Sequence, residues 1–106
     1  MPDPERVATL KQVLDANPND AFARYALALE YSNAGDTEAA LSEFQRLLAA
    51  NPDYTNGYFM AAQMLVRADR TPEAQQMLQE GMECARRTRN QHALAEMEGM
   101  LNELEH

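Results

Sequence analysis

The chain has 106 residues, enough for one domain with a modest hydrophobic core. Its 17 acidic and 9 basic residues give a net charge of −8, which argues against nucleic acid and anionic membrane surfaces as partners. The one cysteine, Cys84, excludes an internal disulfide, and we interpret it as a small buried side chain in a reducing compartment. Without an export signal or an apolar run of membrane-spanning length, we expect a soluble, cytoplasmic protein.

The chain contains a sequence repeat with a period of 34 residues. Asn17-Pro18 recurs as Asn51-Pro52, and Thr37 and Ala40 recur as Thr71 and Ala74. A fixed period of this length indicates one supersecondary unit that is copied along the chain.

The first expected helix begins at Asp3-Pro4, with aspartate as N-cap and proline in the first turn. Asn17-Pro18 ends it, because the residue before a proline is disfavoured in the α region. Its apolar residues recur at helical spacing: Val7, Leu10, Val13 and Leu14. In the 34-residue register, residues 3–17 are a half repeat, the second helix of a unit whose first helix is missing.

The first full copy covers residues 20–52. A helix over 20–34 carries apolar residues on two faces, which is typical of a sandwiched helix or of a binding surface. Gly35 ends it by left-handed geometry, and Asp36 is a candidate cap for the next helix, 37–50. That helix has one broad apolar stripe, formed by Ala40, Leu41, Phe44, Leu47 and Leu48.

The second copy covers residues 54–86. Its first helix, 54–68, has the inward face Tyr58, Ala61, Ala62 and Leu65. Asp69-Arg70 form the turn, Thr71 is the expected cap, and Pro72 begins the next helix. A closing helix is expected over 89–103, and residues 104–106 resemble the start of an expression tag.

These residues resemble the tetratricopeptide repeat family. In the first copy the family pattern is carried by Leu27, Ala28, Tyr31, Gly35-Asp36, Ala40, Phe44 and Pro52. The leading aromatic is missing, since Arg24 stands in its place. The second copy has Leu78 for the later aromatic and Arg86 where the proline would fall, so its second helix is expected to run longer.

The resemblance implies an all-α fold, an α-solenoid of antiparallel helix hairpins. About six helices would form one domain over residues 1–103, stacked as a right-handed superhelix. Each hairpin in such a stack buries its apolar face against its neighbours. No strand is expected, because the chain has no alternating apolar run and few β-branched residues.

Nothing in the sequence indicates an enzyme, a cofactor or a metal site. His92 has no histidine or cysteine partner that would complete a metal site or a catalytic pair. The carboxylates lie mostly at outward positions, where solubility explains them. A protein–protein interaction module is the function that the family resemblance implies.

The resemblance places the peptide-binding groove on the first helix of each copy. An apolar, methionine-containing groove suits an amphipathic helix or an extended apolar segment of a partner. Leu94, Met97 and Met100 would extend this groove. Its predicted lining residues are Phe22, Tyr25, Leu29, Asn33, Asn56, Phe59, Met60 and Gln63.

Two other interpretations stay open. The same apolar face could be buried in a homodimer, which would make the chain a self-associating structural domain. Arg86, Arg87 and Arg89 could receive an acidic partner, or could complement a helix terminus while pairing with Glu80 and Glu83. Family members that clamp chaperone tails use Lys, Arg and Asn where this chain has Tyr25, Leu29 and Met60, so that subtype is not expected.

Overall fold

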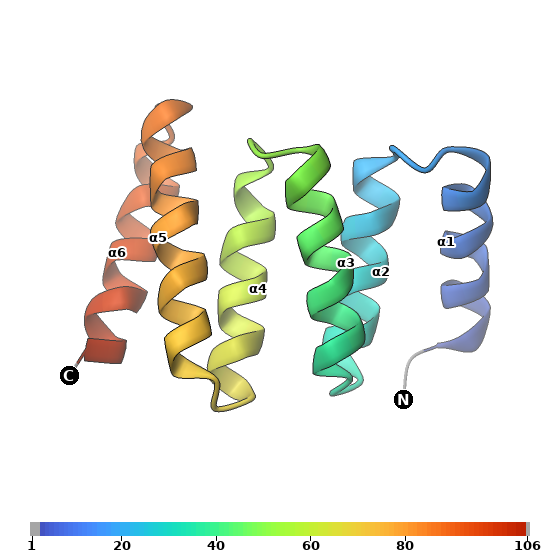
Figure 1. Ribbon diagram of the computed structural model, residues 1–106, viewed down its shortest axis with the longest axis horizontal. Coiled ribbons are helices and arrows are strands. Elements are labelled where there is room, and N and C mark those ends of the chain that lie inside the picture. The colour runs from blue at the N-terminus through green and yellow to red at the C-terminus, as the bar shows by residue number, and fades with distance from the viewer. Residues whose placement is uncertain (1–2, 106) are drawn as a thin grey trace. The chain divides into compact units, whose positions relative to one another are not determined.

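The computed structural model describes residues 3–105, and within that range it contains helices and no strand (Figure 1). The helices are α1 (Pro4–Ala16), α2 (Ala21–Asn33), α3 (Thr37–Ala50), α4 (Thr55–Arg67), α5 (Thr71–Arg87) and α6 (Gln91–Glu105). The all-α prediction is confirmed. The described residues group into two compact units, α1–α3 up to Asn51 and α4–α6 from Pro52 onward. The helix reaching Glu105 includes part of the segment interpreted as a tag, whereas His106 lies outside the described residues.

Aspartate side chains begin the three helices of the first unit. Asp3 accepts hydrogen bonds from the backbone N–H groups of Glu5 and Arg6, as the sequence predicts. Asp20 and Asp36 cap α2 and α3 in the same way, which satisfies donors that a helix start leaves unpaired. The prediction for Thr71 is wrong: α5 begins at Thr71, and the preceding Arg70 occupies the cap position without a side-chain cap bond.

The three turns inside the hairpins share one geometry. Gly35, Asp69 and Arg89 have φ values of 81°, 62° and 59°, in the left-handed region that terminates helices. The residue after each of them donates its backbone N–H to a carbonyl oxygen in the last turn of the preceding helix. The N–O distance is 3.0 Å from Asp36 to Tyr31 and 2.8 Å from Arg70 to Leu65. Asn90 makes the same bond. The turn positions predicted at Gly35-Asp36 and Asp69-Arg70 are therefore confirmed.

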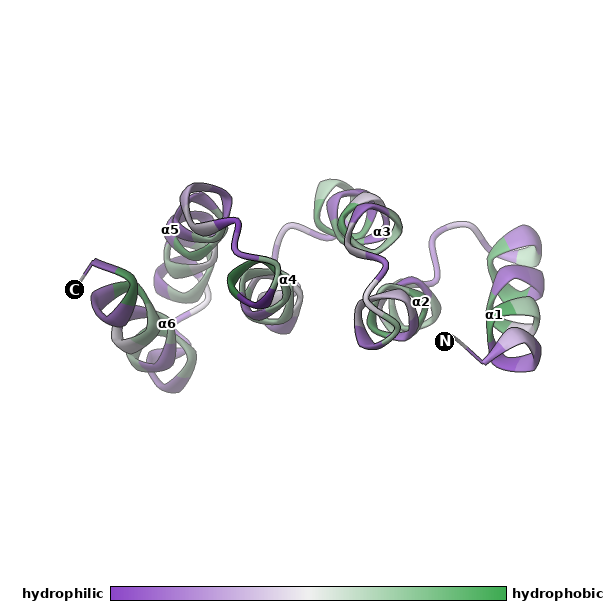
Figure 2. Ribbon diagram, turned by 90° about the horizontal axis from the view of Figure 1, so that it is seen from below, coloured by the Kyte–Doolittle hydropathy of each residue, from purple (hydrophilic) through white to green (hydrophobic). Residues whose placement is uncertain are grey.

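The first unit buries its apolar residues between α2 and its two neighbours. Leu14 of α1 packs with Ala23 and Leu27 of α2, and Figure 2 shows the hydrophobic side of α1 turned toward α2. On the other side α3 packs on α2 through its apolar stripe, of which Phe44 and Leu47 are fully buried. Ala28 and Ala40 are also fully buried, because small side chains let two helix backbones approach closely.

The second unit contains a close helix approach at Gly81. Gly81 of α5 lies where an added Cβ would meet the Sδ of Met97 at 2.6 Å and the Cβ of Tyr58 at 2.7 Å. Glycine therefore lets α5 approach both α4 and α6. As predicted, α5 runs past the expected proline position to Arg87, and its Cys84 is fully buried.

The two copies differ at the position of the family's leading aromatic. Tyr58 donates its hydroxyl proton to the carbonyl oxygen of Pro52 at 2.8 Å, and burial raises the pKa of this phenol. Arg24, 34 residues earlier, donates from Nη2 to the carbonyl oxygen of Pro18 at 3.2 Å. The arginine thus bonds to the loop carbonyl equivalent to the one that the tyrosine bonds, but it brings a positive charge into the hairpin.

Gly81→Ala is expected to destabilise the protein by about 1–3 kcal/mol, because the new methyl group overpacks against the rigid Cβ of Tyr58. Gly99→Ala is the matched control. Gly99 has no atom within 4 Å of an added Cβ, so alanine there should be neutral or stabilising by about 0.5–1 kcal/mol through helix propensity. Urea unfolding followed by circular dichroism measures both, and equal free energies of unfolding for the two variants would contradict the close approach.

Glu30 connects the start of α1 to α2. Its carboxylate accepts the backbone N–H of Asp3 at 2.8 Å and Nη1 of Arg6 at 3.1 Å. These bonds, the first above all, hold the pKa of Glu30 below its usual value of 4.5. The ionised form is favoured by folding, so this contribution is present above that pH and is lost as pH falls through the lowered pKa.

Glu30→Gln should therefore flatten the acid side of the stability curve. As pH falls below about 4.5, the wild-type protein should lose stability more steeply than the variant does. Thermal unfolding across this range measures the difference, with exposed Glu98→Gln as the control. Parallel pH curves for wild type and Glu30→Gln would show that the bonds of Glu30 contribute nothing.

Candidate functional site

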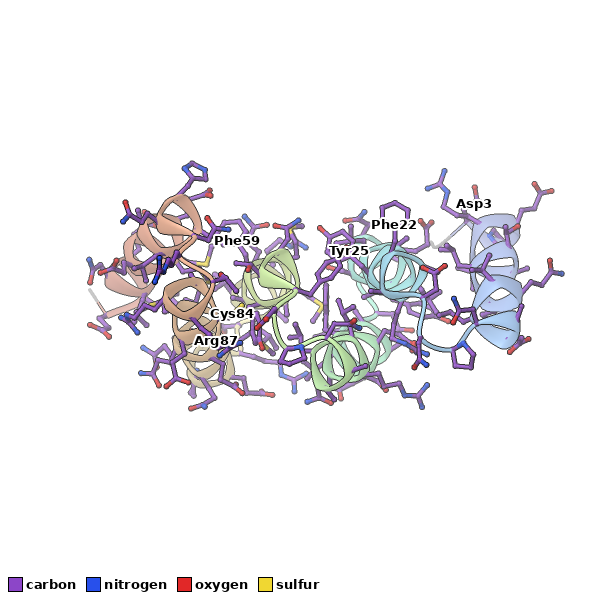
Figure 3. The ribbon with its side chains drawn as sticks, turned by 90° about the horizontal axis from the view of Figure 1, so that it is seen from above. Asp3, Phe22, Tyr25, Phe59, Cys84 and Arg87 are labelled. Carbon is purple, nitrogen blue, oxygen red and sulfur yellow. The ribbon has the colours of Figure 1, made fainter. Side chains whose placement is uncertain are left out.

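A groove lies on the second unit between α4 and the start of α6, and we call it the α4–α6 groove. It has a volume of about 300 Å³. Figure 3 shows Phe59 between the two helices. The structure places all four groove residues predicted in the second copy along it, and adds residues from α6. The lining residues are Thr55, Asn56, Phe59, Met60, Gln63, Asn90, His92, Ala93 and Glu96.

A second hollow of about 290 Å³ continues from Gln63 toward the ends of α4 and α6. Since α4–α5 and α5–α6 are antiparallel hairpins, α4 and α6 run in the same direction (Figure 1). The two hollows share Gln63 and follow one another along these two helices. The second hollow is mainly apolar, lined by Val66, Met100 and Leu104 beside Arg67 and Glu103. The surface therefore changes from a polar beginning to a more apolar end.

The predicted extension of the groove is partly corrected. Met100 lines the second hollow, but Met97 is fully buried beside Gly81, so it offers no surface to a ligand. Leu94 is half-buried. Helical spacing alone does not predict that Met97 is buried while Met100 lines a hollow. Which face of α6 packs on α5 depends on the space that Gly81 leaves for Met97.

The four groove residues predicted in the first copy lie on α2. Phe22 is 72% exposed, and Figure 3 shows its ring extending away from the helix. Tyr25 and Leu29 are half-buried, and Asn33 is exposed at the end of α2. These side chains form a separate surface, the α2 face, within the first unit. A single groove that combines all eight residues stays a prediction.

The arginine cluster is only partly available to a partner. Arg87 donates from Nη2 and Nε to Oδ1 of Asp53, at 2.6 and 3.0 Å, and also to the carbonyl oxygen of Pro52. The bond with Asp53 raises the pKa of Arg87. Arg86 and Arg89 are exposed. Arg87 is therefore held by Asp53 from the loop before α4, and pairing of the cluster with Glu80 and Glu83 stays a prediction.

The groove offers hydrogen bonding and apolar contact. His92 at its rim is paired with Glu96, Nε2 to Oε1 at 2.9 Å. Among residues 3–105 no group of three or more His, Cys, Asp or Glu side chains is arranged to hold a metal ion. Over the same residues, no helix has the length and hydrophobicity needed to cross a membrane.

The sequence did not indicate the contribution of Thr55, Asn90, Ala93 and Glu96 to the groove. Asn90 is the residue that could have indicated this wall of the groove. It caps α6 by accepting the N–H of Ala93 at 3.1 Å. A cap at this position starts α6 beside the start of α4, which brings polar residues of both helix ends together.

The fold and these sites define a class of protein, a helical-hairpin repeat module. Two family models, both described as tetratricopeptide repeat, match the chain over residues 2–59 and 31–97. The chain belongs to the tetratricopeptide repeat family.

Solved structures with the same fold support this assignment. The chain is 34% identical to a tetratricopeptide repeat domain protein from Salinibacter ruber, over 84% of this chain and 90% of that one, with a TM-score of 0.76. A protein from Bordetella parapertussis is 20% identical, over 92% and 85% of the two chains, with a TM-score of 0.79. The TPR2B domain of yeast Sti1, in a complex with pHsp70, is 14% identical over 96% and 82%, with a TM-score of 0.85.

No curated protein matches the chain by sequence. The family nevertheless fixes the general role. Tetratricopeptide repeats mediate protein–protein interactions, and proteins built from them are generally scaffolds without enzymatic activity. The particular partner and the surface used depend on the residues outside the repeat pattern.

Proposed function

We propose that this chain is a protein-binding module that holds an apolar peptide or helix of its partner in the α4–α6 groove. The observation that carries the proposal is the position of Asn56, Phe59, Met60 and Gln63, which line one groove together with residues from α6. The second hollow extends this surface along both helices.

The chemistry of the groove suits a peptide. Phe59 and Met60 are half-buried and offer apolar contact, and methionine adapts its shape to different side chains. The amides of Gln63 and Asn90 supply hydrogen-bond donors and acceptors for the backbone of a bound segment. A partner segment with apolar side chains on one face and a free backbone or polar face would make both the apolar contacts and the hydrogen bonds.

The yeast Sti1 domain is an example of this fold in complex with a protein partner, pHsp70. At 14% identity, the likeness supports use of the fold for binding and leaves the partner open. We do not propose a chaperone tail for this chain, because Tyr25, Leu29 and Met60 stand where the tail-clamping members have Lys, Arg and Asn. The module acts by binding alone, without cofactor or catalysis, and the buried thiol of Cys84 fits a cytoplasmic protein.

Met60→Glu should weaken capture of the partner by about tenfold or more, because it replaces an apolar contact beside Phe59 with a carboxylate that is costly to desolvate. The measurement is quantitative pull-down from a lysate of the source organism with immobilised wild type and variant. Gln79→Glu, which adds the same charge at an exposed position of α5, is the matched control. Proteins captured equally by wild type, Met60→Glu and Gln79→Glu would contradict use of the groove, provided both variants retain their helical circular dichroism.

A second candidate function is self-association through the α2 face. The observation that favours it is the 72% exposure of Phe22, since a large aromatic side chain left in water is a common anchor of an interface. A symmetric dimer would bury the same face of both copies.

For self-association, sedimentation at high micromolar concentration should give a dimer mass for the wild type and a monomer mass for Phe22→Ser. The substitution removes the apolar ring from an exposed position, so the fold should be unchanged. A wild-type protein that remains monomeric at the highest concentration would reject this candidate and leave the α4–α6 groove unaffected.

A further inference from the structure

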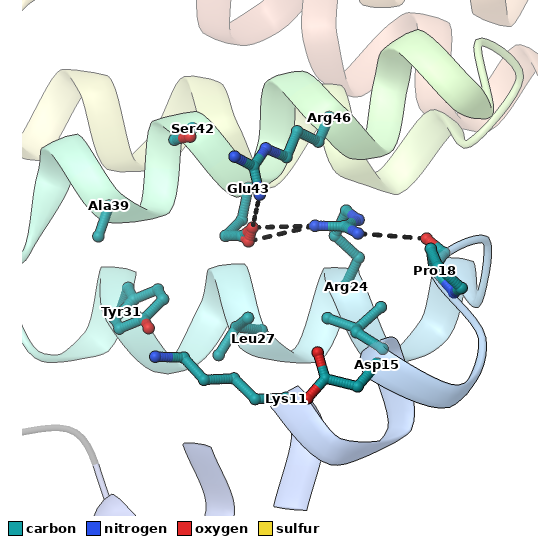
Figure 4. Close-up of a pocket in the computed structure, with 11 residues that line it drawn as sticks. Lys11, Asp15, Pro18, Arg24, Leu27, Tyr31, Ala39, Ser42, Glu43 and Arg46 are labelled. Carbon is teal, nitrogen blue, oxygen red and sulfur yellow. Dashed lines mark hydrogen bonds and ion pairs between the residues drawn. The ribbon is translucent and has the colours of Figure 1, made fainter. Parts of the chain in front are cut away.

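A hollow in the first unit lies between α1 and α3, with α2 as its base, and we call it the α1–α3 cleft (Figure 4). Its volume is about 610 Å³, which is within the range of ligand-binding pockets. None of the residues named in the predicted groove lines it. The cleft is therefore a surface separate from the α4–α6 groove and from the α2 face.

One wall of the cleft holds a nearly buried ion pair. Arg24 donates from Nη1 to both carboxylate oxygens of Glu43, at 3.0 and 3.3 Å, and the two side chains are 15% and 9% exposed. Arg46 Nη1 lies 3.6 Å from the same carboxylate (Figure 4). Two arginines thus share one carboxylate, so Glu43 presents no net negative charge to a ligand.

The charges that remain open favour an anionic ligand. Arg46 is 67% exposed on α3, and Lys11, the one lysine of the chain, is exposed on the opposite wall from α1. Asp15 is the one opposing charge on that wall. Taken together, Lys11, Arg24 and Arg46 against Asp15 and Glu43 leave the cleft with an excess of one positive charge, in a chain whose net charge is −8.

The base of the cleft is apolar. Leu14 and Leu27 are buried there, and the half-buried ring of Tyr31 lies beside them. A ligand that fills the cleft must therefore combine an apolar group for the base with an anionic group for the space between Lys11 and Arg46. An acidic side chain next to a large apolar one in a peptide has this combination.

We propose that the α1–α3 cleft is a docking site for a protein segment that presents an aspartate or glutamate beside a large apolar residue. The carboxylate lies between Lys11 and Arg46, and the apolar side chain contacts the base formed by Leu14, Leu27 and Tyr31. With this cleft the module has two faces for partners. The proposal does not depend on the α4–α6 groove.

The test begins with selection from a library of random short peptides displayed on phage, against the immobilised full chain. Recovered peptides are measured by fluorescence anisotropy at 0.15 M salt, where the Debye length of about 8 Å limits the effect of distant charges. The expected sequences have an acidic residue adjacent to Leu, Ile, Met or Phe. The double variant Lys11→Gln/Arg46→Gln should bind them about tenfold or more weakly.

Three further variants make the outcome specific. Lys11→Arg/Arg46→Lys keeps both charges and should retain binding. Asp15→Asn removes the opposing charge and should strengthen binding by about twofold or more. Met60→Glu, which changes the α4–α6 groove, should leave binding of the selected peptides unchanged. Each variant is first checked for unchanged helical circular dichroism.

The proposal is overturned if the selection recovers no peptide, if the recovered peptides lack acidic residues, or if they bind the Lys11→Gln/Arg46→Gln variant as tightly as wild type. Peptides that lose binding with Met60→Glu and keep it with the double variant would also overturn it, while supporting the α4–α6 groove. If the cleft binds peptides and the α4–α6 groove does not, binding is lost with Lys11→Gln/Arg46→Gln and kept with Met60→Glu. The two proposals can therefore fail separately.

Discussion

The hairpins α2–α3, α4–α5 and α5–α6 depend on a turn whose middle residue has left-handed backbone geometry. With this geometry only three residues separate the two helices, which therefore lie side by side in opposite directions. The apolar faces of such a pair are then forced together, and the fully buried alanines at Ala28, Ala40, Ala62 and Ala74 permit a close backbone approach. Glycine meets this backbone requirement freely at Gly35, whereas Asp69 and Arg89 adopt it at a conformational cost.

Most of the fold could be predicted because repeat patterning acts locally. The period placed Gly35 and Asp69 in turns and placed Phe44 and Leu78 in the core. The error at Thr71 has a physical cause. Threonine before proline is a common N-cap sequence, but the hydrogen-bonded turn after α4 ends at Arg70, so the cap position falls on Arg70 and Thr71 is already helical. Cap residues are identified by backbone angles, and these depend on the turn as a whole.

The site was predictable only in part, because a groove needs the spacing between two helices. The period predicts which face of α4 is turned away from α5, and the structure finds Asn56, Phe59, Met60 and Gln63 on one groove. It does not predict that the other wall starts at Asn90, or that Arg87 is held by Asp53 from a loop 34 residues earlier. Both depend on contacts between segments distant in the sequence.

Departures from the repeat pattern produce the surfaces that distinguish the two copies. In the second copy, Tyr58 bonds to the loop carbonyl and presents an apolar ring to Gly81. In the first, Arg24 makes the equivalent bond and needs Glu43 as a counter-charge, where the second copy has Met77. A buried ion pair contributes little to stability compared with apolar packing, so the aromatic would serve the fold at least as well. The physical consequence of the exchange is a polar wall beside an apolar base, which makes the α1–α3 cleft chemically unlike the α4–α6 groove and the second hollow of the second unit.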